Sequence, residues 1–270
     1  MKNKKVRALV ESAIMIAVAT VLSMIKIIDL PYGGSVTVAS MFPIAIISYR
    51  YGIKWGLASG VVYGALQQLL GLSTLSYVTT WQSVVAIILL DYVIAFAVAG
   101  LGGAFRNVAS NQPIAFALGA LLVCILRYLC HVISGATVWA GISIPTKAAL
   151  IYSFIYNATY MIPEAIIMVI VAVYIGSIMN FKANIPTRII NNKYNATASM
   201  FTMLAGLPIT AALITDVALV FSKLQNAETG EFTLEHIAEA NWTLVGIVSV
   251  GATVIATVLL LIGVSKRKNA

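Results

Sequence analysis

The chain has 270 residues, of which 60% are hydrophobic and only 10% are charged, whereas a soluble domain carries about 25% charged residues. One water-soluble core of this size has no room for so many apolar side chains, so the composition excludes a soluble globular protein and indicates one embedded in lipid. The formal net charge of +8 lies in short segments between apolar runs, a distribution that is typical of membrane topology and not of nucleic-acid binding.

Eight apolar runs follow one another along the chain. A hydrocarbon layer about 30 Å thick takes roughly 20 helical residues to cross, and most of the runs reach that length. We therefore predict an all-α, multi-pass integral membrane protein, in which the second run is short enough to be tilted or partly interfacial. The runs lie at residues 8–28, 36–50, 53–72, 82–104, 113–139, 148–178, 199–222 and 242–265.

Basic residues indicate the orientation of the runs. They precede the first run and follow every second run, so an even number of spans puts them all on one side of the membrane. By the positive-inside rule that side is the cytoplasm, which predicts a plasma-membrane protein with both termini in the cytoplasm. The residues are Lys2, Lys4, Lys5, Arg7, Arg50, Lys54, Arg106, Lys182, Arg188, Lys193, Lys266, Arg267 and Lys268.

A polar stretch at residues 181–198, which contains Pro186, interrupts the apolar pattern after the sixth run. Its composition predicts a cytoplasmic linker. The chain then divides into a six-helix core at residues 1–180, this linker, and a two-helix transmembrane hairpin at residues 199–270. The sequence predicts no role for the hairpin.

Small residues recur four apart in two of the runs. Gly56, Gly60 and Gly64 repeat in the third run, and Ala13 and Ala17 in the first. This spacing lets two helices approach closely, so we expect the third run to pack tightly inside the bundle.

Three polar residues are expected at one depth in the membrane. Counted from the outer end of each run, Asp91, His131 and Asn157 are each about nine positions in, roughly 13 Å below the outer surface at about 1.5 Å per residue. An ionisable group at the centre of a span costs about 2.5–3.5 kcal/mol on insertion scales and needs a partner or a ligand. An acid, an imidazole and an amide from three helices therefore predict a polar pocket that opens outward.

The fifth run adds a stripe at every fourth position, formed by Arg127, His131, Gly135 and Trp139. The stripe offers a cation, an imidazole, a gap for a flat ring and an indole on one helix face. A second tryptophan, Trp81, stands at the outer start of the fourth run. Aromatic walls over a buried acid suit a flat organic cation, which gains up to about 2 kcal/mol from cation–π contact when desolvated.

Structural roles stay open for the same residues. The two tryptophans are also typical of an interfacial aromatic belt. Asp91 also suits an ion pair with Arg127, and Asn157 also suits a hydrogen bond between helices. We assign Glu164, which lies deeper on the sixth run, to structure, as a group that neutralises Arg127.

Motifs for chemistry on a substrate are missing from the sequence. It contains no GxxxxGK[ST] phosphate loop, no HExxH, no cluster of metal ligands and no serine in a nucleophile elbow. We therefore predict that the protein is not an enzyme, that it holds no metal or cofactor, and that any use of ATP requires partner subunits.

Five segments follow one another in order along the chain. They are YGGSVTVASMFPI at 32–44, RYGIKWGL at 50–57, LLDYVIAF at 89–96, LRYLCHVISG at 126–135 and IYSFIYN at 151–157. Together they resemble the bacterial ThiT family, the thiamine-specific S components of energy-coupling factor (ECF) transporters. The resemblance spans roughly residues 8–178, about two thirds of the chain.

The resemblance implies a six-helix fold, a substrate site near the extracellular face and high-affinity capture of thiamine, which is the transported ligand and not a cofactor. In the family, an acid followed by a tyrosine binds the aminopyrimidine and a tryptophan stacks on the ligand. The matching site residues here are Trp81, Asp91, Tyr92, Arg127, His131, Gly135, Trp139, Tyr152 and Asn157.

The resemblance also implies partners, namely a transmembrane coupling protein and two ATP-binding subunits of an ECF module. Ala13 and Ala17 match the small residues that dock on the coupling protein. Some family members cover the ligand with a tryptophan in the first external loop, whereas Gly34 stands at that position here. Tyr32 is then the candidate that covers the site. The C-terminal hairpin is a second departure from the family.

Two alternative functions follow from these departures. The missing loop tryptophan favours an S component for another vitamin or for a thiamine precursor. The additional hairpin favours a self-sufficient, proton-coupled secondary transporter, in which Asp91, Glu164 and Asp216 form a proton relay.

Overall fold

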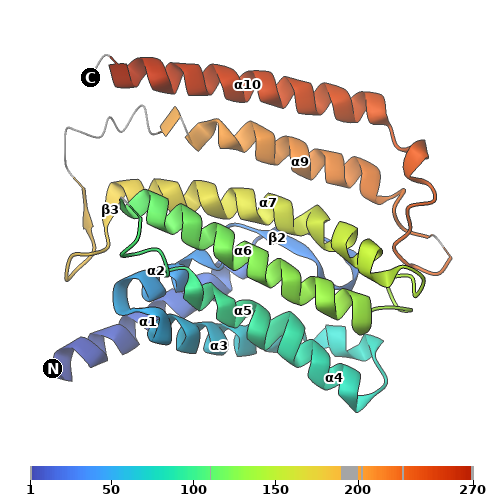
Figure 1. The fold of residues 1–270 in the computed structure, drawn as a ribbon, viewed down its shortest axis with the longest axis horizontal. Coiled ribbons are helices and arrows are strands. Elements are labelled where there is room, and N and C mark those ends of the chain that lie inside the picture. The colour runs from blue at the N-terminus through green and yellow to red at the C-terminus, as the bar shows by residue number, and fades with distance from the viewer. Residues whose placement is uncertain (1, 110, 190–199, 202, 227, 269–270) are drawn as a thin grey trace.

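The computed structural model describes residues 2–109, 111–189, 200–201, 203–226 and 228–268. Its helices run roughly side by side in a bundle (Figure 1), and the prediction of an all-α, multi-pass membrane protein is confirmed. Within the described residues, five helices are long and apolar enough to cross a membrane. They are α1 (Lys2–Met24), the helix at Trp81–Leu101, α6 (Gln112–Thr137), α7 (Ala149–Ile178) and α10 (Trp242–Lys268).

The fourth predicted run changes its helical geometry along its length. It begins as α4 (Trp81–Ile87), widens into the π-helical turn η3 (Ile88–Ile94), and ends through α5 (Ala95–Ala97) and the 3-10 turn η4 (Val98–Leu101). Single π-helical turns are rare inside α-helices, and those that occur often lie at functional sites. This turn carries Asp91.

The helix α3 (Ile53–Leu70) packs against the fourth run through its glycines. A Cβ atom on Gly60 would lie 2.8 Å from the carbonyl oxygen of Ala97, and one on Gly64 would lie 2.8 Å from that of Tyr92. Backbones this close leave no space for a side chain, so the predicted role of the glycine repeat in tight helix packing is confirmed.

The prediction of one helical run at residues 36–50 is wrong, because its first six residues are not helical. The strands β1 (Lys26–Asp29) and β2 (Ser35–Thr37) form an antiparallel pair across the 3-10 turn η1 (Pro31–Gly33). The helix α2 (Phe42–Tyr51) begins only afterwards, and its 10 residues span about 15 Å. The β-branched residues of β2 favour a strand, and Ala39, with φ of 53°, stands in a left-handed conformation that a right-handed helix excludes.

The extended segment and α2 together cross the bundle. Near the end of α2, Arg50 pairs with Glu11 of α1, with 2.7 Å between Nε and Oε2, whereas β2 pairs with β1 beside the opposite end of α1. Extended backbone at membrane depth needs partners within the protein. Glu164 on α7 accepts hydrogen bonds from the backbone N–H of Thr37 at 2.5 Å and from its hydroxyl at 2.8 Å. These contacts support the structural role assigned to Glu164, while neutralisation of Arg127 by this carboxyl stays a prediction.

The C-terminal region adds α9 (Gly206–Phe221) and α10, which are joined by a loop at residues 222–241 that contains the 3-10 turn η5 (Ile237–Glu239). α9 lies between α7 and α10 (Figure 1). With 16 residues, it is shorter than the five spanning helices. The two ends of the chain lie on the same side of the molecule (Figure 1), as an even number of crossings requires.

The predicted linker at residues 181–198 is described as far as residue 189. Just before and within it, β3 (Met179–Asn180) pairs with β4 (Thr187–Arg188). Residues 190–198, which include Lys193, lie outside the described part of the chain, so the cytoplasmic linker stays a prediction.

Candidate functional site

A cavity of about 440 Å³ opens where α6 ends and α7 begins. Its walls come from the β1–β2 hairpin, the turn after α3, the π-helical turn η3, and both α6 and α7. Seven of the nine predicted site residues line it, namely Asp91, Tyr92, Arg127, His131, Gly135, Trp139 and Asn157. Side chains from three separate predicted runs, the fourth, fifth and sixth, therefore lie around one cavity.

The other two predicted site residues lie away from the cavity lining. Trp81, at the start of α4, is 71% exposed, which is the exposure expected of an interfacial aromatic. Tyr152, on α7, directs its ring toward Phe232 of the C-terminal loop, with 6.2 Å between the ring centroids.

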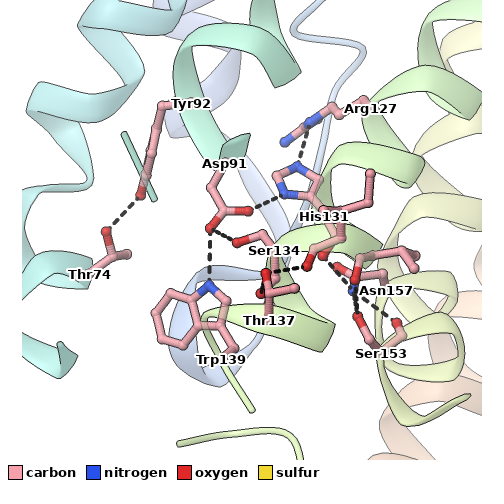
Figure 2. A network of polar contacts seen from close by, with 12 residues as sticks. Thr74, Asp91, Tyr92, Arg127, His131, Ser134, Thr137, Trp139, Ser153 and Asn157 are labelled. Atoms are coloured by element: carbon pink, nitrogen blue, oxygen red, sulfur yellow. Dashed lines mark hydrogen bonds and ion pairs between the residues drawn. The ribbon is translucent and has the colours of Figure 1, made fainter. Parts of the chain in front are cut away.

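Asp91 is the centre of the polar network in the cavity (Figure 2). Its Oδ1 lies 2.9 Å from Nδ1 of His131. Its Oδ2 accepts hydrogen bonds from the hydroxyl of Ser134 at 2.6 Å and from the indole N–H of Trp139 at 3.0 Å. A carboxylate has about four acceptor positions, so these three partners leave one for a ligand.

Arg127 fixes the protonation of His131. The guanidinium Nε–H donates to Nε2 of His131 at 3.1 Å, and a guanidinium always carries its protons. Nε2 is therefore the acceptor nitrogen, so the ring is neutral and its Nδ1–H donates to Asp91. The imidazole thus stands between the cation and the carboxylate, and the direct ion pair of Asp91 with Arg127 that the sequence left open is replaced by this relay of hydrogen bonds.

The remaining contacts of Arg127 are with soft and aromatic groups. Its carbon Cζ lies 4.4 Å from the ring centroid of Phe96, and one terminal nitrogen lies 3.7 Å from the sulfur of Met41. The side chain is only 8% exposed. A buried guanidinium over an aromatic face is held partly by cation–π attraction, and it supplies the positive charge that balances Asp91.

Asn157 joins α6 to α7 beside the cavity. Its Nδ2 donates to the backbone oxygen of Ser153 at 2.9 Å and lies 3.3 Å from the backbone oxygen of His131, while its Oδ1 accepts from the hydroxyl of Tyr160. Gly135 permits this contact, because a Cβ there would lie 2.2 Å from Oγ of Ser153. The expected gap for a ligand ring at Gly135 is thus taken up by helix packing.

Tyr92 turns its hydroxyl to the wall opposite α6 and α7. Its Oη lies 3.1 Å from Oγ1 of Thr74, in the 3-10 turn η2 (Leu72–Tyr77), and 3.3 Å from the backbone oxygen of Gly71. A Cβ on Gly71 would lie 2.2 Å from that hydroxyl. The lack of a side chain at Gly71 therefore sets the position of the Tyr92 ring in the cavity.

Sequence reasoning missed two tyrosines of the site. Tyr156 and Tyr160 line the cavity, although their spacing of four on the sixth run favours plain helix packing. They also explain why no tryptophan stands in the first loop, because a Cβ on Gly34 would lie 2.9 Å from the ring of Tyr160 and 3.3 Å from the hydroxyl of Tyr156. The space of a larger side chain is already occupied.

Tyr32 also lines the cavity, and its role as the residue that covers a ligand stays a prediction. Its ring centroid is 5.1 Å from that of Tyr77 and 6.3 Å from that of Trp139. Its φ of 61° is left-handed, which is uncommon for a residue with a bulky side chain. The turn therefore holds this ring over the cavity against the ordinary preference of its backbone.

Comparisons with known proteins identify the family of the chain. Residues 9–184 match the family described as Thiamine transporter protein (Thia_YuaJ). The chain belongs to this family. It is 35% identical over 181 residues to the Thiamine transporter ThiT of Bacillus subtilis (strain 168), a match that covers 63% of this chain and 90% of that relative. The descriptions of the family and of this relative are both those of thiamine transporters.

A solved structure supports the same fold. The structure of ThiT from Listeria monocytogenes superposes with a TM-score of 0.52 at 23% identity, over 64% of this chain and 94% of that one. The family match ends at residue 184, so the α9–α10 hairpin lies beyond the part of the chain that the family shares.

Proposed function

We propose that this protein captures thiamine in the cavity and acts as the high-affinity S component of an ECF-type importer. The observation that carries the proposal is the Asp91 network, in which a carboxylate whose side chain is only 13% exposed keeps one acceptor position toward an aromatic-walled cavity. Thiamine has a permanent thiazolium charge and a hydrogen-bonding aminopyrimidine, so it needs both an acceptor and aromatic faces.

In the proposed complex, Asp91 and Asn157 pair with the edge of the aminopyrimidine. Trp139 stacks on one ring while its N–H stays on Asp91. His131 and Tyr92 face the thiazolium ring or its hydroxyl tail. We give Trp81 and Tyr152 no direct contact, because neither lines the cavity.

The proposal includes the partners that the S-component role requires. A transmembrane coupling protein and two ATP-binding subunits would drive release of thiamine into the cytoplasm, with both termini of the chain on that side. Ala13 and Ala17 are exposed on α1, among apolar side chains such as Ile14, which is 55% exposed. A lipid-facing strip with small residues at its centre suits docking of another membrane helix.

Isothermal titration of the purified full-length protein tests thiamine binding. We expect Asp91→Ala to weaken binding by more than about 2 kcal/mol, because a polar ligand group would then be buried without its partner. Asp216→Asn is the matched control, since Asp216 is also an intramembrane acid but lies outside the cavity lining. Equal affinity of wild type and Asp91→Ala would contradict the proposal, and stronger competition by the free pyrimidine than by thiamine would identify a precursor as the ligand.

Uptake into vesicles tests the importer role. We expect thiamine uptake to require ATP and the partner subunits. If uptake continues without ATP and the partner subunits, and stops when the proton gradient is removed, the protein is instead a secondary transporter.

A further inference from the structure

The loop between α9 and α10 lies against the mouth of the cavity, although it belongs to a hairpin beyond the residues that match the family. The backbone N–H of Phe232 donates to the backbone oxygen of Ser143 at 2.7 Å, and Ser143 lines the cavity. The contact joins residues on the α6–α7 connection and the α9–α10 loop, which lie at the same end of the bundle (Figure 1).

The ring of Phe232 packs on the tyrosines of α7. It is 2% exposed, and its centroid lies 5.4 Å from that of Tyr156 and 6.2 Å from that of Tyr152. Tyr156 in turn donates its hydroxyl hydrogen bond to the backbone oxygen of Pro31 at 2.7 Å. Phe232 therefore supports a cavity wall that also holds the turn with Tyr32.

The same loop reaches Tyr32 directly. A Cβ on Gly230 would lie 2.6 Å from the Tyr32 hydroxyl, so Gly230, with φ of 73°, lets the loop backbone approach the ring. Hydrogen bonds also link described residues within the loop. Gln225 donates from Nε2 to the backbone oxygen of Gly230 at 3.0 Å, and Thr233 N–H donates to the backbone oxygen of Leu224 at 2.7 Å.

The loop thus touches three residues that line the cavity, Tyr32, Ser143 and Tyr156, while its own residues stay behind them. We propose that the C-terminal hairpin braces the mouth of the site, with Phe232 as the positioning residue that keeps Tyr32 and Tyr156 over a bound ligand. This inference rests on the proposed function only for the identity of the ligand, thiamine. Because the mouth must open for exchange in either direction, the brace slows both entry and escape.

Stopped-flow binding of thiamine to the full-length protein tests the brace. In Phe232→Ala we expect both association and dissociation to accelerate, with dissociation about tenfold faster. Loss of a plain ligand contact would raise only the dissociation rate, and a purely structural role of Phe232 would lower the unfolding temperature without changing either rate of the folded protein. Ile247→Ala is the matched control, since Ile247 is an apolar residue of the same hairpin that is 64% exposed.

Gln225→Ala is a second variant that keeps the test decisive if Phe232→Ala fails to fold. It removes a hydrogen bond inside the loop and leaves every cavity residue in place, so we expect both rates to rise in the same direction by a smaller factor. Wild-type rates in folded Phe232→Ala, or in Gln225→Ala if the first variant does not fold, would overturn the brace. A wild-type protein that binds no thiamine would instead contradict the proposed function.

Discussion

The cavity wall and the α9–α10 hairpin treat their partly buried acids, Asp91 of η3 and Asp216 of α9, in opposite ways. In the wall of the cavity, Asp91 has three hydrogen-bond partners from two elements. In the hairpin, Asp216 has one, the hydroxyl of Ser249 at 2.6 Å, and its Oδ1 is without a hydrogen-bond partner in the described residues. The helices also differ in burial. In the most apolar 18-residue stretch of each helix, 39% of the residues of α7 are buried inside the protein, against 11% of those of α10.

This difference separates a built site from a polar residue in a helix contact. An acid at membrane depth is costly wherever it stands, so its presence alone marks neither function nor structure. Several converging donors with one acceptor position left toward a cavity are a stronger sign of a ligand site. The comparison predicts that substitutions in the wall act on binding or folding, whereas substitutions in the paired faces of the hairpin helices have small effects.

Glu164→Ala should have the largest effect on stability. It would leave the backbone N–H of Thr37 without its acceptor beside a side chain that is 0% exposed, whereas the Thr37 hydroxyl would keep Oγ of Ser40 at 2.9 Å. We expect a loss of about 2 kcal/mol, since a buried unsatisfied donor costs about 1–3 kcal/mol. Thermal unfolding of the purified protein measures it, with Glu164→Gln as the control that keeps one acceptor and loses less. An unchanged unfolding temperature in Glu164→Ala would contradict the structural role of Glu164.

The same contact shows where sequence reasoning stops. Regular helices rise by a fixed distance per residue, so counting was enough to predict that Asp91, His131 and Asn157 meet. The extended crossing before α2 broke that rule, because its conformation depends on an acceptor 127 residues away, the carboxyl of Glu164. A run that is apolar and short carries no local sign of that partner.

In the rest of the site, features that depend on local sequence patterns were predictable, and features that depend on distant contacts were not. The glycine repeat of α3 was predictable, since spacing of four reports on one helix face. The place of Tyr156 was not, because Tyr156 contacts the loop turn at Pro31 and Phe232 of the C-terminal hairpin, which are far away in sequence. Gly71 belongs to the same group, as its role follows only from the position of the Tyr92 hydroxyl.

Gly71→Ala should have an intermediate effect, on binding and not on folding. Its φ of −101° suits any residue, but the new methyl group would displace the Tyr92 hydroxyl and break its contact with Thr74. We expect thiamine affinity to fall about tenfold, measured by titration calorimetry, and to recover in part when Tyr92→Phe removes the clashing oxygen. Gly246→Ala is the control, because a Cβ there meets nothing within 4 Å. Equal affinities in all variants would show that Tyr92 does not shape the site.

Asp216→Asn should have the smallest effect and is the sharpest test of the contrast. The amide oxygen of Asn still accepts the hydrogen bond from Ser249, and the ionisable carboxyl is removed from the helix pair. We therefore expect the free energy of unfolding to change by less than about 1 kcal/mol, and to increase if it changes. Thiamine affinity and uptake should equal those of the wild type. A proton relay through Asp91, Glu164 and Asp216 makes the opposite demand, because an amide cannot pass a proton along such a relay at neutral pH. Uptake assays of Asp216→Asn with and without a proton gradient therefore decide between a hairpin that braces the site and one that carries protons.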